Sequence, residues 1–539
     1  MFTRHQPKEW LKAGKGWLVP TVQVSKYKKP DPIEPAELES LGSSSSKTRV
    51  HLARVGRKDP VASNYAASYL LARALFEDEP VDGAKILVKP NNTGFVGVFY
   101  NSPMLRPILE KNRISTDPDL QPIATQPAMI AGAIDALLDM GAGEIHLGEN
   151  MLWEGGTPRA FLENGYAHVF SRDTYRDKVF FVDFYEEGEE LLEFELETRG
   201  NDLGFFTKTR IPKSLLEEKY DYFLNAPIAK MHNNTMYTLC VKNSSIGWNP
   251  TKSRWHAHGM PFAYFDAERA AEAFDFSPTP GLEYEVLRVR KLNETKSREV
   301  IVTNGMESTG PMKAYRENGE WLMQVDPHHR EGNNLVTLIM AMSYVASRAA
   351  SLNGTVYNIM RKNKTKTFGL VSGIVGQEGE GPLIFGARKF GGFAAASKDP
   401  VALEAACINI MTGEGSVDWP ARMTRVSQNF ARRFGCSADP LVRDADPPWW
   451  IKLASDLTGG EWDYKKVSYD LIDMTGSGQI SSLWDVRSGA PFKLPWGVFC
   501  RPRTWIRMMF TEKGIHRNAM RFFEKGVEIP LIPGVTLKS

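Results

Sequence analysis

The chain has few cysteines for its length and no cysteine spacing that fits a metal cluster. Among its 539 residues there are four cysteines, Cys240, Cys407, Cys436 and Cys500, and no C-x-x-C pair. Iron–sulfur clusters are held by closely spaced thiolates, so we expect no iron–sulfur cluster in this chain. Widely separated cysteines are typical of buried thiols in a reducing compartment.

Long hydrophobic runs and an excess of one charge are missing as well. No apolar stretch approaches the roughly 18 residues of a membrane-spanning helix, and residues 1–10 lack the apolar segment of a secretory signal. The 66 basic and 64 acidic side chains nearly cancel, so no overall electrostatic field attracts nucleic acid. The sequence therefore predicts a cytoplasmic protein without a transmembrane segment and without a nucleic-acid partner.

Several well-known catalytic signatures are also absent. No G-x-G-x-x-G follows the first predicted strand with an acidic residue at the proper distance, and no G-x-x-x-x-G-K-[ST] occurs. Dinucleotide binding and P-loop nucleotide binding are therefore disfavoured. A G-x-S-x-G elbow is missing too, which argues against a hydrolase of that class.

Five short apolar runs are present, and each of them ends in a polar or Gly-rich loop. In open α/β sheets, ligands bind just outside the carboxyl ends of the strands. We therefore expect the polar side chains on these loops to converge on one site. The predicted strands cover residues 85–89, 144–148, 222–224, 370–375 and 393–396.

Helical spacing of apolar residues alternates with these runs, which predicts an α/β fold with a mostly parallel sheet and helices on both faces. Helices are predicted over residues 60–76, 126–140, 335–352 and 400–411, and Gly354 is expected to end the third. Two β-rich runs near residues 284–289 and 300–302 predict a smaller α+β insertion.

Composition divides the chain further into five expected parts. They are an N-terminal extension with a Ser-rich linker (1–48), a first α/β lobe (49–263), the α+β insertion or lid (264–330), a second α/β part (331–414) and an irregular, Trp- and Arg-rich C-terminal extension (415–539).

Five short motifs lie on or beside the predicted strand ends. They are Lys89-Pro90-Asn91, the turn Pro227-x-x-Lys230-x-His232, the stretch Lys242-Asn243 followed by Gly247, the loop Glu378–Pro382 and the helix start Asp399–Ala402. With these motifs, the chain resembles the bacterial and archaeal family known as domain of unknown function 362 over roughly residues 80–412.

Two features depart from the pattern of that family. Glu404 stands where many members carry Asp, and the ferredoxin-like, cysteine-rich module that is fused to many members is absent from this chain. If redox chemistry in the family depends on that module, this chain either lacks that chemistry or takes electrons from a partner. The resemblance implies no established reaction.

Lysine and amide side chains are concentrated on the predicted strand-end loops. Ammonium groups and amide donors that point into one crevice would suit a small anionic ligand with a phosphate or carboxylate group. The alternative is that each lysine is a solvated loop charge and each asparagine a turn residue. The candidate ligand-binding residues of this kind are Lys89, Lys230, Lys242, Asn91, Asn92, Asn225 and Asn243.

Carboxylates fall on the same loops. A carboxylate beside an ammonium group can divide acid and base roles with it when burial separates their pKa values. For Asp399, which precedes a proline at a helix start, capping of that helix is the alternative. For the two glutamates of the Gly-rich loop, a surface position is the alternative. The carboxylate candidates are Glu149, Glu378, Glu380 and Asp399.

Histidines provide a candidate site for a divalent metal. In an extended segment, His256 and His258 point to the same side, and together with His232 they would offer three nitrogen ligands and an open fourth position. His328 and His329 form a weaker cluster, because adjacent side chains diverge on a strand. The alternatives for the H-x-H pair are a contact to an anion or a hydrogen-bonded role near the surface.

These patterns predict a protein that binds a small anionic ligand, with or without a metal, for acid/base or isomerisation-type chemistry. The catalytic candidates are His232, Glu378 and Lys230. The main alternative is a non-catalytic scaffold or assembly subunit, or a redox protein that depends on a partner. Residues 1–48 and 415–539 are the candidate segments for a protein partner, and association into a homo-oligomer is left open.

Overall fold

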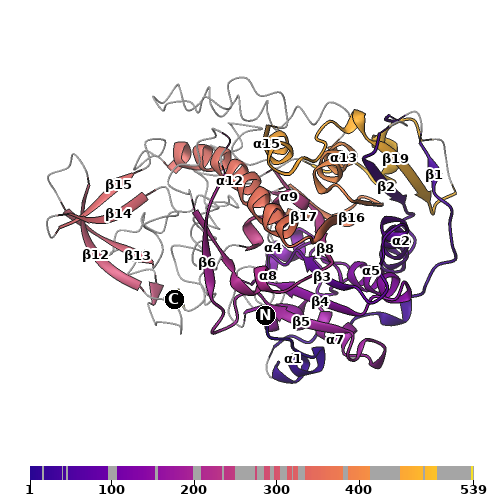
Figure 1. Cartoon of the computed structure of the whole chain (residues 1–539), viewed down its shortest axis with the longest axis horizontal. Coiled ribbons are helices and arrows are strands. Elements are labelled where there is room, and N and C mark those ends of the chain that lie inside the picture. The colour runs from indigo at the N-terminus through magenta and orange to yellow at the C-terminus, as the bar shows by residue number, and fades with distance from the viewer. Residues whose placement is uncertain are drawn as a thin grey trace.

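The computed structural model of the chain contains a large central sheet, helices on both of its faces and a separate smaller sheet (Figure 1). The described residues are 1–14, 17–38, 41–43, 46–94, 106–151, 156–197, 199, 208–232, 236–248, 274–275, 284–291, 297–303, 312–317, 320–325, 334–379, 386–412, 449–476, 480–493 and 536–537.

Twelve strands form one mixed sheet in the described part of the chain. Nine of them follow one another side by side, β9 and β17 also pair with β16, and β10 pairs with β9. In spatial order, the nine are β1 (Ala36–Glu37), β19 (Ser468–Asp473), β2 (Arg49–Arg54), β18 (Phe393–Ser397), β16 (Lys366–Gly379), β8 (Tyr222–Ala226), β3 (Lys85–Pro90), β4 (Glu144–Glu149) and β5 (Val179–Asp183), and the other three are β9 (Ile228–His232), β10 (Met236–Thr238) and β17 (Gly386–Phe390).

The centre of this sheet is parallel, as the alternating pattern predicted. Strands β16, β8, β3, β4 and β5 all run in the same direction, whereas β18 is antiparallel to both of its neighbours. From β3 the chain continues to β4 and β5 on one side, and later adds β8 and β16 on the other. Such a switch in strand order is where open α/β sheets leave room for a ligand at the carboxyl ends of the strands.

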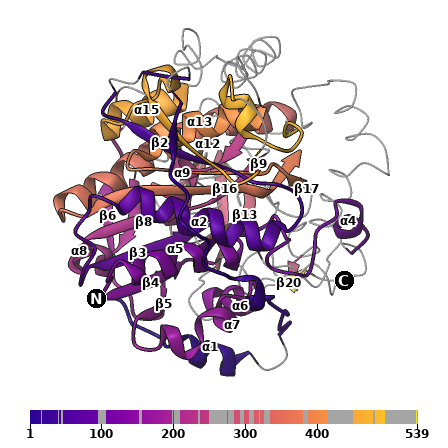
Figure 2. The same cartoon turned by 90° about the vertical axis from the view of Figure 1, so that its right-hand side faces the viewer.

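Helices cover both faces of the sheet, which confirms the predicted α/β class. In Figure 2, one layer of helices lies above β16 and another lies below it. The upper layer contains α12 (Asn334–Lys362), α13 (Pro400–Thr412) and α15 (Trp449–Thr458), with the short α9 (Cys240–Asn243) beneath α12, and the lower layer contains α2 (Pro60–Phe76) and α5 (Pro127–Asp139).

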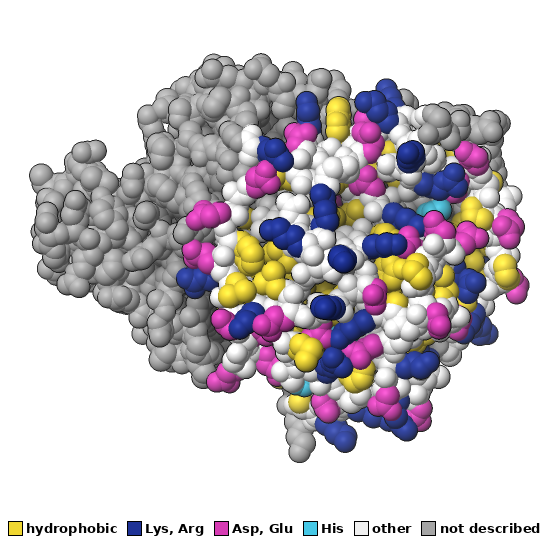
Figure 3. All heavy atoms as spheres, in the orientation of Figure 1, with side chains coloured by type: hydrophobic (Ala, Val, Ile, Leu, Met, Phe, Trp, Pro, Cys, Tyr) yellow, Lys and Arg dark blue, Asp and Glu magenta, His cyan; other side chains and the backbone are white. Residues whose placement is uncertain are grey.

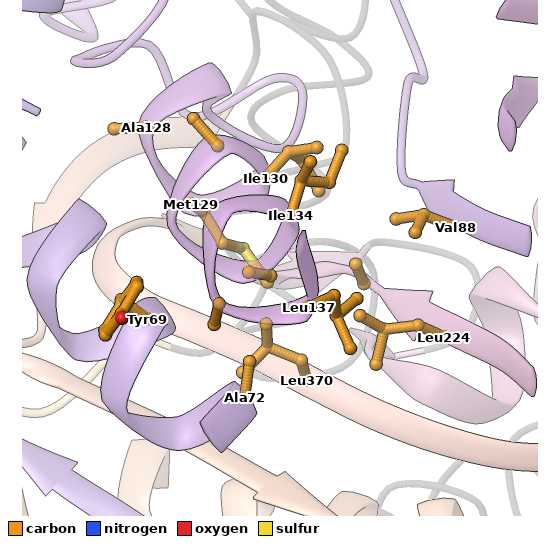
Figure 4. Close-up of a cluster of buried hydrophobic side chains, with 14 of the residues drawn as sticks. Tyr69, Ala72, Val88, Ala128, Met129, Ile130, Ile134, Leu137, Leu224 and Leu370 are labelled. Carbon is orange, nitrogen blue, oxygen red and sulfur yellow. The ribbon is translucent and has the colours of Figure 1, made fainter. Parts of the chain in front are cut away.

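Helices α2 and α5 begin and end within one residue of the predicted bounds. Each has proline at its first position, where the missing N–H costs no hydrogen bond, and Asp59 caps α2 by accepting from Ala62 N at 3.2 Å. Gly132 lets the helices approach closely, because a Cβ there would lie 2.2 Å from the Tyr65 carbonyl. Burial of each large apolar side chain between them and the sheet contributes about 1.5–3 kcal/mol. Figure 4 shows Ala72, Ile134, Leu137, Val88, Leu224 and Leu370 in this layer.

Helix α12 is longer than predicted. It continues to Lys362, past Gly354, which was expected to end it. Gly354 instead lies against α15, where a Cβ would come within 2.7 Å of Leu457 Cβ. In a sequence, a glycine that permits close helix packing resembles a glycine that ends a helix, and this explains the error.

The other helices and strands flank the sheet. One two-stranded ribbon joins β6 to β7, and another joins β11 to β20. The bounds are α1 (Pro7–Ala13), α4 (Arg106–Lys111), α6 (Gly156–Glu163), α7 (Tyr166–Phe170), α8 (Lys213–Glu217), β6 (Leu191–Glu195), β7 (Lys208–Pro212), β11 (Phe274–Asp275) and β20 (Thr536–Leu537), with 3-10 turns at Val24–Lys26, Asp173–Tyr175, Ile246–Trp248, Tyr464–Lys466 and Leu483–Val486.

A four-stranded sheet corresponds to the predicted insertion and lies apart from the main sheet, at the left of Figure 1. Both predicted β-rich runs are strands, and they pair with each other antiparallel. The four strands are β12 (Tyr284–Lys291), β13 (Ser297–Thr303), β14 (Met312–Glu317) and β15 (Glu320–Val325).

Parts of both extensions belong to the main body, which differs from the expected division of the chain. Phe2 and Trp10 are buried, and the isolated bridge between His5 and Phe181 lies beside β5. From the other extension, β19 pairs with β2 and with β1 inside the main sheet. Pairing between strands more than 400 residues apart leaves no local pattern in the sequence, so composition could not reveal it.

Charge is mixed on the described surface. In Figure 3, basic and acidic side chains alternate over the described part of this face, and neither sign forms one large patch. Among the described helices, none combines the length and the apolar character that crossing a membrane requires.

Candidate functional site

Most of the polar residues predicted at strand ends lie together at the carboxyl ends of β3, β4 and β8. Lys89 is the last residue but one of β3, Glu149 ends β4, and Asn225 precedes the last residue of β8. All three side chains are buried, and Lys89 is in register with Asn225. The parallel direction of the strands therefore brings these residues to one edge, at the switch between β3 and β8.

Lys89 and Glu149 form a buried ion pair. Their Nζ and Oε1 atoms are 2.8 Å apart, and the side chains are 1% and 2% exposed. Glu149 also accepts the backbone N–H groups of Asn92 at 2.9 Å and Asn150 at 3.0 Å. Because both charges are withdrawn from water, each depends on the other, and removal of one would cost about 3–5 kcal/mol.

Lys230 is fully buried and donates to three oxygens that carry no formal charge. Its Nζ donates to Asn91 Oδ1, to Thr93 Oγ1 at 3.1 Å and to the Ile123 carbonyl at 2.8 Å. Burial lowers the pKa of Lys230 to about 7, although the negative charge of Glu149 opposes the shift. A pKa near 7 leaves both the charged and the neutral form of Lys230 populated at neutral pH.

Three of the four predicted asparagines form a chain of side-chain hydrogen bonds. Asn243 Oδ1 accepts from Asn91 Nδ2 at 2.9 Å, and Asn243 Nδ2 donates to Asn225 Oδ1 at 2.8 Å. Asn225 Nδ2 in turn donates to the Cys240 carbonyl at 2.8 Å. These amides join β3, β8 and α9, and they orient the Asn91 oxygen toward Lys230.

The fourth asparagine, Asn92, has an amide donor left over. Its Oδ1 accepts from Asn164 Nδ2 at 3.3 Å and from the Tyr166 hydroxyl at 3.4 Å. Its Nδ2 has no hydrogen-bond partner among the described residues, although the residue is only 3% exposed. A buried donor of this kind is costly unless a ligand or water accepts from it.

His232 and Lys242 are buried beside members of this set. His232 follows Lys230 by two residues on β9, so both side chains lie on the same face of the strand. Lys242 directly precedes Asn243 on α9. The structure thus brings Lys89 and Lys230 together through Asn91 and Asn243, with Lys242 and His232 close to them along the chain.

Glu378 does not face Lys230. Strand β16 extends through the segment that was expected to be a loop, and Gln377 is opposite Lys230 in the pairing with β9. Alternation along the strand turns Glu378 to the other face. There Glu378 Oε2 lies 3.1 Å from Lys389 Nζ and accepts the Lys493 N–H at 3.0 Å. The expectation that Glu378 and Lys230 share one side of the sheet is therefore wrong.

Asp399 lies at the opposite edge of the sheet. The preceding strand, β18, is antiparallel to β16, and Ser397 is opposite Gly369 near the start of β16. Asp399 Oδ1 accepts the backbone N–H groups of Val401 and Ala402 at 2.9 and 3.1 Å, as the N-cap of a helix does. The expectation of a shared edge is wrong for Asp399, because an apolar run does not reveal the direction of its strand.

The metal hypothesis depends on His256 and His258, which lie outside the described residues. The same is true of the weaker pair, His328 and His329, and of Glu380. Among the residues that are described, no group of three or more His, Cys, Asp or Glu side chains is arranged to hold a metal ion.

Sequence reasoning missed several groups that surround Lys230 and Glu149. Ile123 contributes a backbone carbonyl, for which no side-chain signal exists. Thr125 Oγ1 accepts the Asn91 N–H at 2.9 Å. Asp183 ends β5 in register with Glu149, and burial raises the pKa of Asp183 to about 6. The available signal for Asp183 was its position directly after an apolar run, residues 179–182.

Comparison with known proteins gives a family but no reaction. The family model described as a domain of unknown function (DUF362) matches residues 109–409, more than half of the chain. A crystal structure of a protein from Thermotoga maritima is 10% identical and covers 77% of this chain and 89% of that chain, with a TM-score of 0.26. That score is too low to support an argument about fold or site. No curated protein matches the chain.

Proposed function

The chain belongs to the domain of unknown function 362 family, and from this premise we propose that it is an enzyme that binds a small anionic ligand at the carboxyl ends of β3 and β8 and transfers a proton through Lys230. The proposal rests on one observation, a fully buried ammonium group surrounded by three uncharged oxygens. A buried lysine with a purely structural role is expected to contact a carboxylate, because a buried charge needs an opposite charge.

A lysine of this kind suits acid/base chemistry. With a pKa of about 7, Lys230 can both donate and accept a proton at neutral pH. The ammonium form, which binds the anion, would donate its proton to one atom of the ligand. The amine that results would take a proton from a carbon next to a carbonyl or carboxylate group, which restores the ammonium form. An isomerisation needs no more than these two transfers. His232, on the same face of β9, is the second acid/base candidate.

Thr93 indicates the side from which a ligand would reach Lys230. Its hydroxyl lies 3.1 Å from Lys230 Nζ, farther than the Ile123 carbonyl at 2.8 Å. Thr93 is also half-buried, whereas Asn91 and Ile123 are buried. A carboxylate or phosphate oxygen that replaced this hydroxyl would meet the ammonium group with little rearrangement. The Asn92 Nδ2 donor would supply a second contact.

In this proposal the ion pair of Lys89 and Glu149 holds the site and does not react. Glu149 accepts from the backbone of Asn92, so the pair fixes the segment after β3 that carries Asn92 and Thr93. Since Glu149 neutralises Lys89, the negative charge of a ligand is met mainly by Lys230.

The alternative of an assembly subunit that docks through the N-terminal extension has less support. Phe2 and Trp10 are buried against this chain itself, and Arg4 pairs with Glu144 and Glu218 at 3.1 and 3.3 Å. These contacts within the chain favour a structural role for residues 2–10 over a docking role.

Calorimetric titration with a panel of small carboxylates and phosphates tests the proposal. We expect at least one anion to bind the wild-type protein, and Lys230→Met to weaken that binding about tenfold or more, because a charged hydrogen bond is lost. Binding should also weaken as the pH rises through about 7, where Lys230 loses its charge.

Two further variants make the result interpretable. Lys230→Arg keeps the charge but cannot release its proton at neutral pH, so it should bind the anion and lose proton exchange. Lys366→Met is the matched control, because Lys366 pairs with Glu79 at the amino edge of the sheet. The affinity of this variant for the anion should equal that of the wild-type protein. Equal affinities of Lys230→Met and wild type, or no binding by any anion of the panel, would contradict the proposal.

A further inference from the structure

A segment of the N-terminal extension, residues 22–29, lies across α2 and the loop before α5. We call this segment the arm. The Tyr27 ring stacks on Tyr65 of α2, with 5.3 Å between ring centroids and 11° between ring planes. The Tyr27 hydroxyl donates to Asp119 Oδ2 at 2.7 Å, and Gln23 Nε2 donates to Asp117 Oδ2 at 2.9 Å. The arm thus contacts two carboxylates of residues 117–126, which we call the 117–126 loop.

Asp119 connects the arm to the start of α5. It is fully buried, and its Oδ1 accepts the Ala128 N–H at 2.7 Å. Burial raises the pKa of Asp119 to about 7, and the hydrogen bond from Tyr27 opposes this shift. Each donor compensates for water that the buried carboxyl group has lost, so loss of the Tyr27 hydroxyl would weaken the attachment of the loop.

The 117–126 loop contacts Lys230 through a backbone carbonyl. Within the loop, Gln121 Oε1 accepts the Ile123 N–H at 2.7 Å. The Ile123 carbonyl then accepts from Lys230 Nζ at 2.8 Å, and Thr125 Oγ1 accepts the Asn91 N–H at 2.9 Å. The loop therefore supplies one acceptor of Lys230 directly and anchors the residue that supplies another.

From this continuous path we propose that Tyr27 and Asp119 are positioning residues for Lys230. The arm holds the 117–126 loop in the conformation that surrounds the ammonium group with oxygens and keeps water away from it. This inference deepens the proposed function and rests on the role proposed there for Lys230. It can nevertheless be measured without any ligand.

The variant Tyr27→Phe tests the inference, because it removes one hydroxyl and keeps the stacked ring. Carbon-13 NMR of labelled lysine side chains over a series of pH values, with the Lys230 signal assigned from Lys230→Met, measures the fraction of neutral amine. We expect the midpoint for Lys230 to rise by about one pH unit toward the ordinary lysine pKa near 10.4, because water enters the loosened site and stabilises the charged form. Hydrogen exchange in the 117–126 loop should become faster in the same variant.

The control is Tyr69→Phe. Tyr69 of α2 donates to Asp139 Oδ2 of α5 at 2.7 Å, so Tyr69→Phe also removes a hydrogen bond from a tyrosine to an aspartate. This hydrogen bond does not involve the 117–126 loop. A purely structural role would lower the stability of both variants and leave the Lys230 midpoint unchanged in both. If Tyr27→Phe does not fold, Gln23→Ala removes the other contact between arm and loop and should shift the midpoint in the same direction.

The outcomes separate this inference from the proposed function. An unchanged Lys230 midpoint in Tyr27→Phe, together with unchanged exchange in the 117–126 loop, overturns the positioning role even if the wild-type protein binds anions. A raised midpoint in Tyr27→Phe supports the positioning role even if no anion binds, in which case the proposed function alone fails.

Discussion

The two ends of the neighbouring strands β3 and β4 carry the same types of charged residue in different arrangements. At the amino ends, Lys85 lies 3.4 Å from Glu144 and also contacts Glu218. Arg4 lies 3.1 Å from Glu144 and 3.3 Å from Glu218. Two basic groups therefore share two carboxylates, and Lys85, Arg4 and Glu144 are partly exposed.

At the carboxyl ends, the balance of charge is different. Lys89 is paired with Glu149 and both are buried, whereas Lys230 contacts only uncharged oxygens among the described residues. The amino ends form a balanced network that holds the N-terminal extension on the sheet. At the carboxyl ends, Lys230 is a buried ammonium group that contacts no carboxylate of the described residues, which costs stability and makes it the better candidate for function.

The largest expected difference between the two ends is the cost of losing a glutamate. Glu149→Gln leaves Lys89 charged and buried without its counter-ion, so the free energy of unfolding should fall by about 3–5 kcal/mol. Glu144→Gln removes a partly exposed carboxylate and should cost about 1 kcal/mol or less, because Arg4 and Lys85 keep Glu218 and the amide oxygen can still accept from His146. Urea denaturation of both variants measures the two costs, and equal losses would contradict the comparison.

The pH dependence of stability should also differ between the ends. The pKa of folded Lys230, about 7, is below the ordinary lysine value near 10.4, so the unfolded chain binds more protons between these values and stability rises with pH there. Burial lowers the pKa of His146, at the amino ends, to about 4, below the ordinary value near 6.5. The contribution of His146 to stability therefore increases with pH between about 4 and 6.5.

Denaturation at a series of pH values separates these two windows. Lys230→Met should remove the rise above neutral pH and leave the acidic one intact, and His146→Asn should do the reverse. If either variant altered both windows, the assignment of one titration to each end of the sheet would not hold.

A smaller effect is expected from Gly247, which makes room for Lys89. A Cβ at this position would lie 2.8 Å from Lys89 Nζ and 3.0 Å from its Cε, so Gly247→Ala should displace the ammonium group from Glu149. We expect a loss of about 1–3 kcal/mol in unfolding free energy and weaker anion binding. Gly56→Ala is the control, because nothing lies within 4 Å of a Cβ there. Equal stabilities of the two variants would show that Lys89 can move at no cost.

The sequence alone determined the fold class, the helices over residues 60–76 and 126–140, and the residue types at the carboxyl ends of β3, β4 and β8. These features follow from local physics. Apolar spacing and a proline at the first helical position specify both helices without reference to the rest of the chain, and Gly141 follows the second. Parallel strands share one edge, and therefore Lys89, Asn225 and Glu149 were predicted together.

Only the tertiary structure decided which of these residues meet. The direction of β18 placed Asp399 at the far edge, and the length of β16 turned Glu378 to the other face. The acceptors of Lys230 include a backbone carbonyl from Ile123, and strand β19 joins the sheet from a distant part of the chain. Strand direction, register and backbone contacts depend on segments far apart in sequence, so no local pattern of side chains records them.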